Sequence, residues 1–262
     1  MTELIHRDHL GEERRLGLIP PDANALAKRK ACASFSGFLA SKGLGVIPES
    51  EWKDKHYEHF DDPKWNLNQG RFSSCVGASS ASAVMKLRYS LGKEFERLSG
   101  PYVYAHINGG RDAGAMITDA MRTIEKDGIC LESEMNYPNI FANQISQKAK
   151  ESGAKRQGIK AFVIASRDEF YSAIQRGFFP VFGVNVDSRF EVFDGNGVSG
   201  AGGGRENHAV HAAGMKKIRG RWCAYMPNTW DPKWGPFGNG ACYIDPTGIN
   251  LNDAYVVVDV EM

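Results

Sequence analysis

The sequence has no long uninterrupted apolar run and almost no net charge. No stretch of 18 consecutive apolar residues occurs in its 262 residues, so no membrane-spanning helix is predicted. Lys and Arg number 32 against 31 Asp and Glu, which gives a formal net charge of +1. This balance gives no general reason to expect nucleic acid or an anionic membrane as a partner. The charged segment 1–15 lacks the apolar core of a signal peptide, so we expect no secretion by the general route.

Cysteine is scarce, and the usual metal-binding patterns are missing. An odd, widely spaced set of cysteines does not indicate a disulfide framework in a chain of this length. The set consists of Cys32, Cys75, Cys130, Cys223 and Cys242. No CxxC pair and no HExxH motif is present, which argues against a structural zinc site and against a zinc protease. The sequence therefore predicts neither a metal nor a cofactor.

The chain shows no internal repeat and has an ordinary hydrophobic content of 42%. Residues 1–45 are charged at first and then mixed, and the Leu18-Ile19-Pro20-Pro21 run breaks any helix there. Residues 24–39 could be helical. We interpret residues 1–45 as an N-terminal extension that packs on or covers the main domain, residues 46–262. A purely structural arm is the alternative.

Helical patterns come first along the chain and strand patterns second. Buried helix faces are predicted from Cys75 onward and over residues 115–126, where Gly128 provides a stop signal. A third helix begins at Ser166, and Glu169 gives it the capping-box pattern. Short segments rich in Val, Phe, Tyr and Ile then predict strands at 178–186, 209–215, 221–226, 241–245 and 254–260. This order predicts an α+β fold with two lobes that meet at a cleft.

Cys75 and Gln69 are the first candidates for chemistry. Cys75 stands at a predicted helix start, where unpaired N–H groups and a partial positive charge favour the nucleophilic thiolate. On position alone it could instead be a small buried hydrophobic residue, as most free cysteines are. Gln69 precedes it across a predicted turn and could donate, with the Cys75 backbone N–H, to a developing oxyanion. A solvated loop glutamine is the alternative.

Two downstream residues could complete such a site. His208 enters a predicted strand after the glycine-rich loop 195–205, and its imidazole could form an ion pair with a thiolate. His211 is the local competitor, but an odd separation along a strand directs it to the other face. Asn228 could accept a hydrogen bond from the imidazole, and Trp230 could cover that bond. A Trp-rich turn that fills a core is the alternative.

Together these motifs resemble the papain and cathepsin family of cysteine peptidases, from about Ile47 to the C-terminus. The matching segments are Asn68-Gln69-Gly70 with Cys75, Asn207-His208-Ala209-Val210, and Asn228-Thr229-Trp230 with Trp234-Gly235. The family's order is Cys, then His and Asn roughly 130–150 residues downstream, and this chain follows it. The resemblance implies a helical N-terminal lobe and a β-barrel-like C-terminal lobe with the active-site cleft between them.

The resemblance also implies an activity and its residues. The chain would be a cysteine endopeptidase that hydrolyses peptide bonds in proteins or peptides through an acyl-enzyme on Cys75. His208 and Asn228 would complete the triad, and Gln69 would bind the oxyanion. Residues beside the substrate would be Gly114, Ala115, Val184, Ala209 and Trp230. The small or apolar side chains among them suggest an apolar preference at the second residue before the cut.

The sequence departs from the family pattern at two positions that bear on the protein's cellular location. Phe72 replaces a cysteine that secreted members use in a disulfide, and Val76 replaces an aromatic residue. The sequence looks closer to microbial or viral branches, and we expect a cytoplasmic, virion-associated or host-cell-associated protein. Two other functions remain open. One is a transglutaminase-type acyltransferase, and the other is a catalytically silent binding or structural protein on the same fold.

Overall fold

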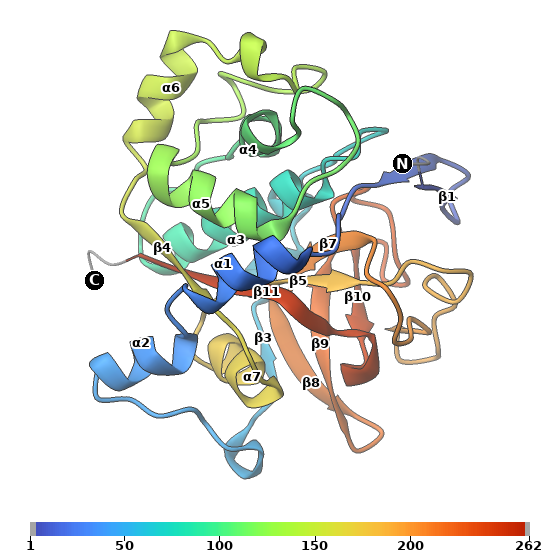
Figure 1. Ribbon diagram of the computed structural model, residues 1–262. Helices are drawn as coiled ribbons and strands as arrows, with labels where there is room; N and C mark the ends of the chain where they lie inside the picture. The colour runs from blue at the N-terminus through green and yellow to red at the C-terminus, as the bar shows by residue number, and fades with distance from the viewer. Residues whose placement is uncertain (1–3, 260–262) are drawn as a thin grey trace.

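The structure is a computed structural model that describes residues 4–259, and it has a helical lobe and a sheet lobe (Figure 1). The helical lobe contains α3 (Cys75–Ser90), α4 (Gly100–Ile107), α5 (Ile117–Asp127) and α6 (Gln147–Ala154). The central helix, α3, is buried from Cys75 to Leu87, and the small residues that predominate there let neighbouring elements approach it closely. It packs against α4 and α5 in its own lobe and against strand β7 of the other lobe. Its N-terminus therefore lies where the lobes meet.

The sheet lobe is built from two open sheets rather than from one closed barrel. One sheet has the order β4-β11-β5-β7, with bounds Ile159–Val163, Asn250–Asp259, Val181–Val184 and His208–His211. The other has the order β3-β8-β9-β10-β6, with bounds Lys55–His56, Gly214–Ile218, Arg221–Pro227, Ala241–Ile244 and Val198–Ser199. Helix α7 (Arg167–Gln175) packs beside β8. The α+β, two-lobed architecture implied by the resemblance is thus confirmed.

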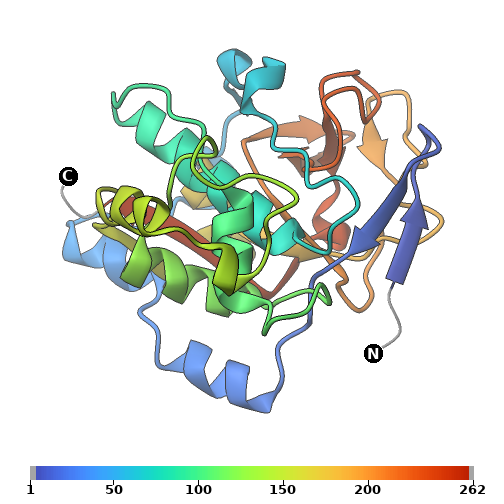
Figure 2. The same cartoon turned by 90° about the horizontal axis from the view of Figure 1, so that it is seen from above.

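The first part of the chain forms a hairpin and two short helices. Strands β1 (Leu4–Arg7) and β2 (Glu13–Leu16) pair with each other, and α1 (Ala23–Lys30) and α2 (Phe35–Ser41) follow. In Figure 2 the hairpin stands beside the sheet lobe, on the side of the molecule away from α2. Short 3-10 turns complete the structure at Glu49–Glu51, Glu58–Asp61, Pro63–Trp65, Ala142–Gln144 and Pro246–Gly248. The segment between β2 and α1 leads from the hairpin to α1, which lies in front of β11 (Figure 1).

The helices predicted from periodicity are confirmed at Cys75, near residue 115 and at Ser166. The Ser166 side chain accepts a hydrogen bond from the Glu169 N–H at 3.1 Å, as an N-cap does. The Glu169 carboxylate, however, binds the N–H groups of Ala165 and Ser36 instead of completing the capping box. The helix predicted over 24–39 is two helices, because Ser34 caps the second one and bridges to Val163 of β4.

The strand predicted over 209–215 is divided between the two sheets. His208–His211 pairs with β5, whereas Gly214–Ile218 pairs with β9. The change takes place at Ala212, whose N–H binds Pro180, and Ala213, whose N–H binds Tyr225. Helices α4 and α6 and strand β4 were not predicted, because their sequences carry little periodicity. Residue 260 of the last predicted strand lies outside the described residues.

No helix within residues 4–259 is long and apolar enough to cross a membrane.

Candidate active site

Cys75 lies at the first turn of α3 and is fully buried. Its Sγ accepts a hydrogen bond from the backbone N–H of Ala209, at a donor–acceptor distance of 3.4 Å. Ala209 is the second residue of β7, directly after His208, so this bond fixes the sulfur beside the histidine strand. The preceding residue, Ser74, bonds through its hydroxyl to the Tyr137 hydroxyl at 2.6 Å. The start of α3 is therefore held from both lobes.

The hydrogen bond between His208 and Asn228 determines the protonation of the histidine ring. His208 Nε2 lies 2.8 Å from Asn228 Oδ1, and the same oxygen accepts the Thr229 N–H at 2.8 Å. The Thr229 bond requires an oxygen at that position, so Nε2 must be the donor. In the neutral ring Nδ1 is then the unprotonated nitrogen. No described residue forms a hydrogen bond with this buried Nδ1.

Trp230 covers this hydrogen-bonded pair. Its ring centroid is 4.9 Å from that of His208, with an angle of 37° between the planes, and its side chain is fully buried. Phe190 packs against both rings, at 5.8 Å from Trp230 and 6.4 Å from His208 between centroids. Water is thereby kept away from the bond between His208 and Asn228, which strengthens it. The sequence analysis suggested that Trp230 could cover the bond between His208 and Asn228, and the ring lies where it can do so.

Gln69 lies beside the start of α3, and Thr229 orients it. Its Oε1 accepts the Thr229 hydroxyl at 2.8 Å, which directs Nε2 the other way. Nε2 donates to the carbonyl of Phe72 at 2.8 Å and to the carbonyl of Arg15 at 3.3 Å. The second acceptor belongs to the N-terminal segment. A backbone carbonyl of that segment therefore lies where Gln69 could bind the oxygen of a reacting group.

Residues 15–20, here called the strap, run through the cleft. Backbone hydrogen bonds tie the strap to both lobes: Leu18 N–H to Asn207 at 3.0 Å, Ile19 N–H to Ala115 at 2.9 Å, and Ala115 N–H to Gly17 at 2.8 Å. The Gly17 N–H lies close enough to Cys75 to lower the pKa of its thiol. A Cβ on Gly17 would stand 1.9 Å from the Ser73 carbonyl oxygen, so only glycine fits at this point.

The strap also contacts the residues proposed to bind substrate. A Cβ on Gly114 would lie 2.4 Å from the Gly17 carbonyl oxygen, and Ala115 pairs with Leu18 as a parallel bridge. Val184 and Ala209 are fully buried in the paired strands β5 and β7 next to the cleft. Leu18 is 5% exposed, and its Cδ2 is 2.9 Å from the position of a Cβ on Gly183. Leu18 therefore fills a pocket on the sheet-lobe side.

Burial beneath the strap moves both reactive groups toward their neutral forms. Loss of hydration raises the pKa of Cys75 to about 11, although N–H groups of Ala209 and Gly17 act in the opposite direction. Loss of hydration also lowers the pKa of His208 to about 4, against the effect of its bond to Asn228. Near neutral pH the covered site therefore contains a thiol and an imidazole rather than an ion pair.

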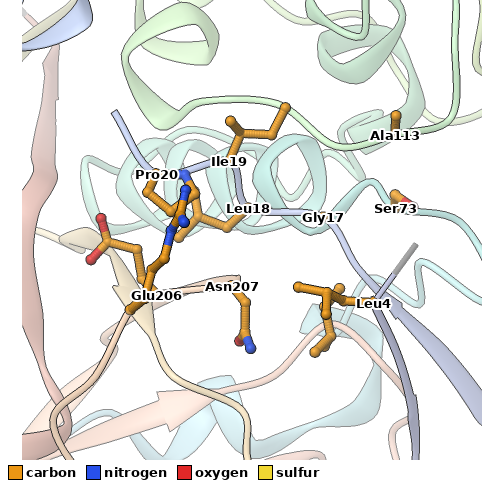
Figure 3. A pocket seen from close by; sticks show the side chains of 11 residues that line it. Leu4, Gly17, Leu18, Ile19, Pro20, Ser73, Ala113, Glu206 and Asn207 are labelled. Carbon is orange, nitrogen blue, oxygen red and sulfur yellow. The ribbon is translucent and has the colours of Figure 1, made fainter. Parts of the chain in front are cut away.

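A cavity of about 410 Å³ remains next to the strap (Figure 3). Its lining includes Leu4, Leu16, Leu18, Ser73, Glu206 and Asn207. The strap forms one wall, and the loop before β7 forms another. The cleft is thus only partly filled by the chain itself. The described residues contain no cluster of three or more His, Cys, Asp or Glu that could hold a metal ion.

Sequence reasoning missed several residues that position the site. Thr229 orients Gln69, and its place between Asn228 and Trp230 was the only signal for it. Asp112 accepts the Ser73 N–H at 2.9 Å and the Tyr104 hydroxyl at 2.9 Å, which ties the turn before Cys75 to α4. Glu191 accepts the Trp234 indole N–H at 2.9 Å. No local pattern pointed to Asp112 or Glu191, because their partners are distant in sequence.

Comparisons with known proteins agree with this arrangement. Xylellain, a cysteine protease from Xylella fastidiosa, matches with a TM-score of 0.66 and 18% identity over 98% of each chain. The proform of the ragweed pollen allergen Amb a 11, a cysteine protease, gives 0.67 and 17% over 89% of this chain and 72% of that chain. Bromelain from Ananas comosus, in complex with the E64 inhibitor, gives 0.56 and 18% over 73% and 91%. At these identities the likeness shows a shared fold.

The sequence itself carries the family assignment. The model of the family described as papain family cysteine protease matches residues 52–247. This range includes α3, β7 and the Asn228 turn, and so all four residues around the buried thiol. The chain therefore belongs to the papain family of cysteine proteases and is a cysteine-type peptidase.

Proposed function

We propose that the protein is an endopeptidase in which Cys75 is the nucleophile, His208 the acid and base, Asn228 the residue that orients the imidazole, and Gln69 an oxyanion donor. The observation that carries the proposal is the pair of hydrogen bonds on Asn228 Oδ1. They leave His208 Nδ1 as the basic nitrogen, on the residue next to the one whose N–H binds the Cys75 sulfur. A base adjacent to a thiol at a helix start is the arrangement that activates a cysteine.

The reaction proceeds in two steps. In the first, the thiolate forms an S–C bond to the peptide carbonyl while the carbonyl electron pair moves to oxygen, held by Gln69 and the Cys75 N–H. The imidazolium gives its proton to the amine as the C–N bond breaks, which leaves a thioester. In the second step His208 takes a proton from water, whose oxygen attacks the thioester, and the carboxylic product leaves as the thiolate re-forms.

We propose further that the strap keeps the enzyme latent. Two observations support this: Gln69 donates to the Arg15 carbonyl, and Gly17 lies so close to the Ser73 carbonyl that a Cβ would overlap it. The strap therefore occupies the part of the cleft next to Gln69 and the start of α3. Tethering raises its effective concentration, so even weak contacts keep the cleft occupied.

The remainder of residues 1–45 has a structural role in this proposal. Phe35 and Leu39 of α2 are at most 1% exposed and belong to the main core. The Val163 N–H binds the Ala33 carbonyl, which joins this part of the chain to β4. An inhibitory function therefore belongs to the strap and its hairpin. A truncated chain that starts near residue 44 would lose core residues along with the strap.

The decisive experiment compares peptide-library cleavage by the full chain, by Cys75→Ala and by Gly17→Ala. We expect low activity in the full chain, higher activity in Gly17→Ala and none in Cys75→Ala. Cleavage by Cys75→Ala at the wild-type rate would remove Cys75 from the mechanism. Adding a primary amine tests the acyltransferase alternative, which predicts amide products in place of carboxylic acids. Failure of Gly17→Ala to react with a thiol-directed epoxide would favour a catalytically silent protein.

A further inference from the structure

Glu206 is a buried carboxyl group without a hydrogen-bonding partner. It stands two residues before His208, is 3% exposed, and neither of its oxygens bonds to any described residue. Leaving a buried acceptor unsatisfied is unfavourable for the fold. A nearby carboxylate, Asp253 of β11, has the hydrogen-bond donors that Glu206 lacks. Asp253 accepts the Ile117 N–H at 2.9 Å and the Thr118 hydroxyl at 2.7 Å.

The Glu206 side chain belongs to the pocket that Leu18 fills. A Cβ placed on Gly183 would lie 2.9 Å from Glu206 Cβ and 2.9 Å from Leu18 Cδ2, so both side chains pack on the same glycine. Figure 3 shows Glu206 on the side of the pocket away from Leu4. Both residues also line the 410 Å³ cavity. When the strap leaves, the Glu206 side chain is part of the pocket that Leu18 vacates.

We propose that Glu206 makes this pocket a binding site for a lysine or arginine side chain of the substrate. The inference rests on the proposed peptidase function, and it names a specificity that the apolar walls alone would not produce. The methylene groups of the basic side chain would replace Leu18 against Gly183 and Ala209. The charged head group would then supply the missing donors to Glu206, and bonds of this kind are stronger than neutral ones.

The charges around Glu206 are consistent with a site for a cation. Burial, and to a smaller extent the nearby Asp253, raises the pKa of Glu206 to about 7, while Arg205 acts in the opposite direction. Arg205 is exposed and forms no hydrogen bond with the carboxyl group, and Arg29 donates to the carbonyls of Ile164 and Leu251. A bound ammonium or guanidinium group would favour the charged carboxylate. In the latent chain Leu18 packs at this place, and Arg205 lines the same cavity without a hydrogen bond to Glu206.

The strap itself provides a test that does not depend on catalysis. In the full chain carrying Cys75→Ala, Leu18 is replaced by Arg or, as a neutral polar control, by Gln, each with and without Glu206→Gln. Urea unfolding gives the stability of each protein. With Glu206 present, we expect Leu18→Arg to have an unfolding equilibrium constant about tenfold smaller than Leu18→Gln, and Glu206→Gln to abolish this advantage. An advantage that is absent, or equal in both backgrounds, would overturn the proposal.

A second arm measures specificity in the full-length Gly17→Ala protein. Peptides carry arginine or its neutral analogue citrulline at the second residue before the cut. We expect kcat/KM to favour arginine about tenfold at pH 8, and the ratio to fall toward one at pH 5.5 and in Glu206→Gln. Hydrolysis with no preference for arginine would contradict the role of Glu206. Coupling in the unfolding assay without hydrolysis of any peptide would support the cation site and contradict the peptidase mechanism instead.

Discussion

At the scale of single residues, the amide of Asn228 fixes the position of the His208 ring. Its Oδ1 accepts from His208 Nε2 and from the Thr229 N–H, so the imidazole is held in one tautomer and one orientation. A carboxylate at this position would add a charge to a buried site. The neutral amide avoids that cost while still fixing the ring. Trp230, packed over the pair, keeps competing water away.

The first prediction concerns this amide. Asn228→Ala should lower kcat by about 10²-fold with little change in KM, because the ring loses its orientation while the substrate pockets remain. Steady-state kinetics in the Gly17→Ala background measure both constants. Asn143→Ala, at an exposed position in the helical lobe, is the matched control and should keep normal kinetics. A drop confined to KM would mean that Asn228 contributes to binding and not to orientation.

The second prediction concerns the pH dependence of the thiol. In the covered site the pKa of Cys75 is raised to about 11, so at pH 7 the sulfur is protonated and should react slowly with an epoxide. The rate should increase about tenfold per pH unit as the pH rises toward 11. Gly17→Ala should react much faster at pH 7, because water can enter and stabilise the thiolate–imidazolium pair. Equal rates for the two proteins at pH 7 would contradict this account of the strap.

At the scale of structural elements, the β1–β2 hairpin anchors the strap beside the proposed catalytic residues. The His6 ring stacks on Trp230 at 5.5 Å between centroids, and its Nε2 lies 3.2 Å from Glu191 Oε1. The His9 N–H donates to the other oxygen of Glu191 at 2.6 Å. The same carboxylate accepts the Trp234 indole N–H, so one partly buried acid joins the hairpin to the aromatic side chains over the site.

The third prediction uses the space around Gly17. Gly17→Ala should displace the strap and raise kcat/KM for a small peptide about tenfold or more, since a Cβ would overlap the Ser73 carbonyl oxygen. Gly45→Ala is the matched control, because nothing lies within 4 Å of a Cβ at that exposed position. A synthetic peptide of residues 4–21, added in trans, should inhibit the opened enzyme. Unchanged activity in a folded Gly17→Ala protein would leave the strap as structure only.

At the scale of the whole molecule, the core contains an ammonium group with no carboxylate partner among the described residues. Lys86 of α3 is completely buried, and its Nζ donates to the Trp65 carbonyl at 3.3 Å and lies 5.7 Å from the Phe60 ring centroid. Burial lowers its pKa to about 7, with a smaller effect of Arg97 in the same direction. The buried His211 has its pKa lowered by burial and by Lys86. The folded state therefore disfavours the protonated lysine.

The fourth prediction follows from linkage. Between about pH 7 and pH 10.5 the unfolded chain keeps the Lys86 proton and the folded chain does not, so stability should rise with pH across this window. Below pH 7 both states are protonated and this contribution is constant. Lys86→Met should raise stability at pH 7 by about 1–4 kcal/mol and flatten the slope. Urea unfolding at pH 7 and pH 9.5 measures both effects, with the exposed Lys155→Met as control. An unchanged slope would mean that Lys86 is charged in the folded state.

Some features of this protein follow from its sequence alone, because they depend on neighbouring residues. The period of small and apolar residues after Cys75, the Ser166 cap and the stop at Gly128 each involve contacts within a few positions. The order of the nucleophile, histidine and asparagine motifs was sufficient to predict the family and the two-lobed fold. The same motifs named the residues that the structure brings around the buried thiol.

Other features depend on contacts between segments that are far apart in the sequence. The Leu18-Ile19-Pro20-Pro21 run predicts a break in helix structure and nothing more, because a strap is held by backbone groups of Asn207 and Ala115 that leave no period in the sequence. Glu206 resembles any loop acid until burial removes its water and Gly183 brings it against Leu18. The sequence alone therefore determined the reactive groups and their order along the chain. The tertiary structure determined that the strap covers Cys75 and His208 and that the buried carboxyl group of Glu206 lacks a hydrogen-bond donor. Both features depend on packing between segments far apart in sequence.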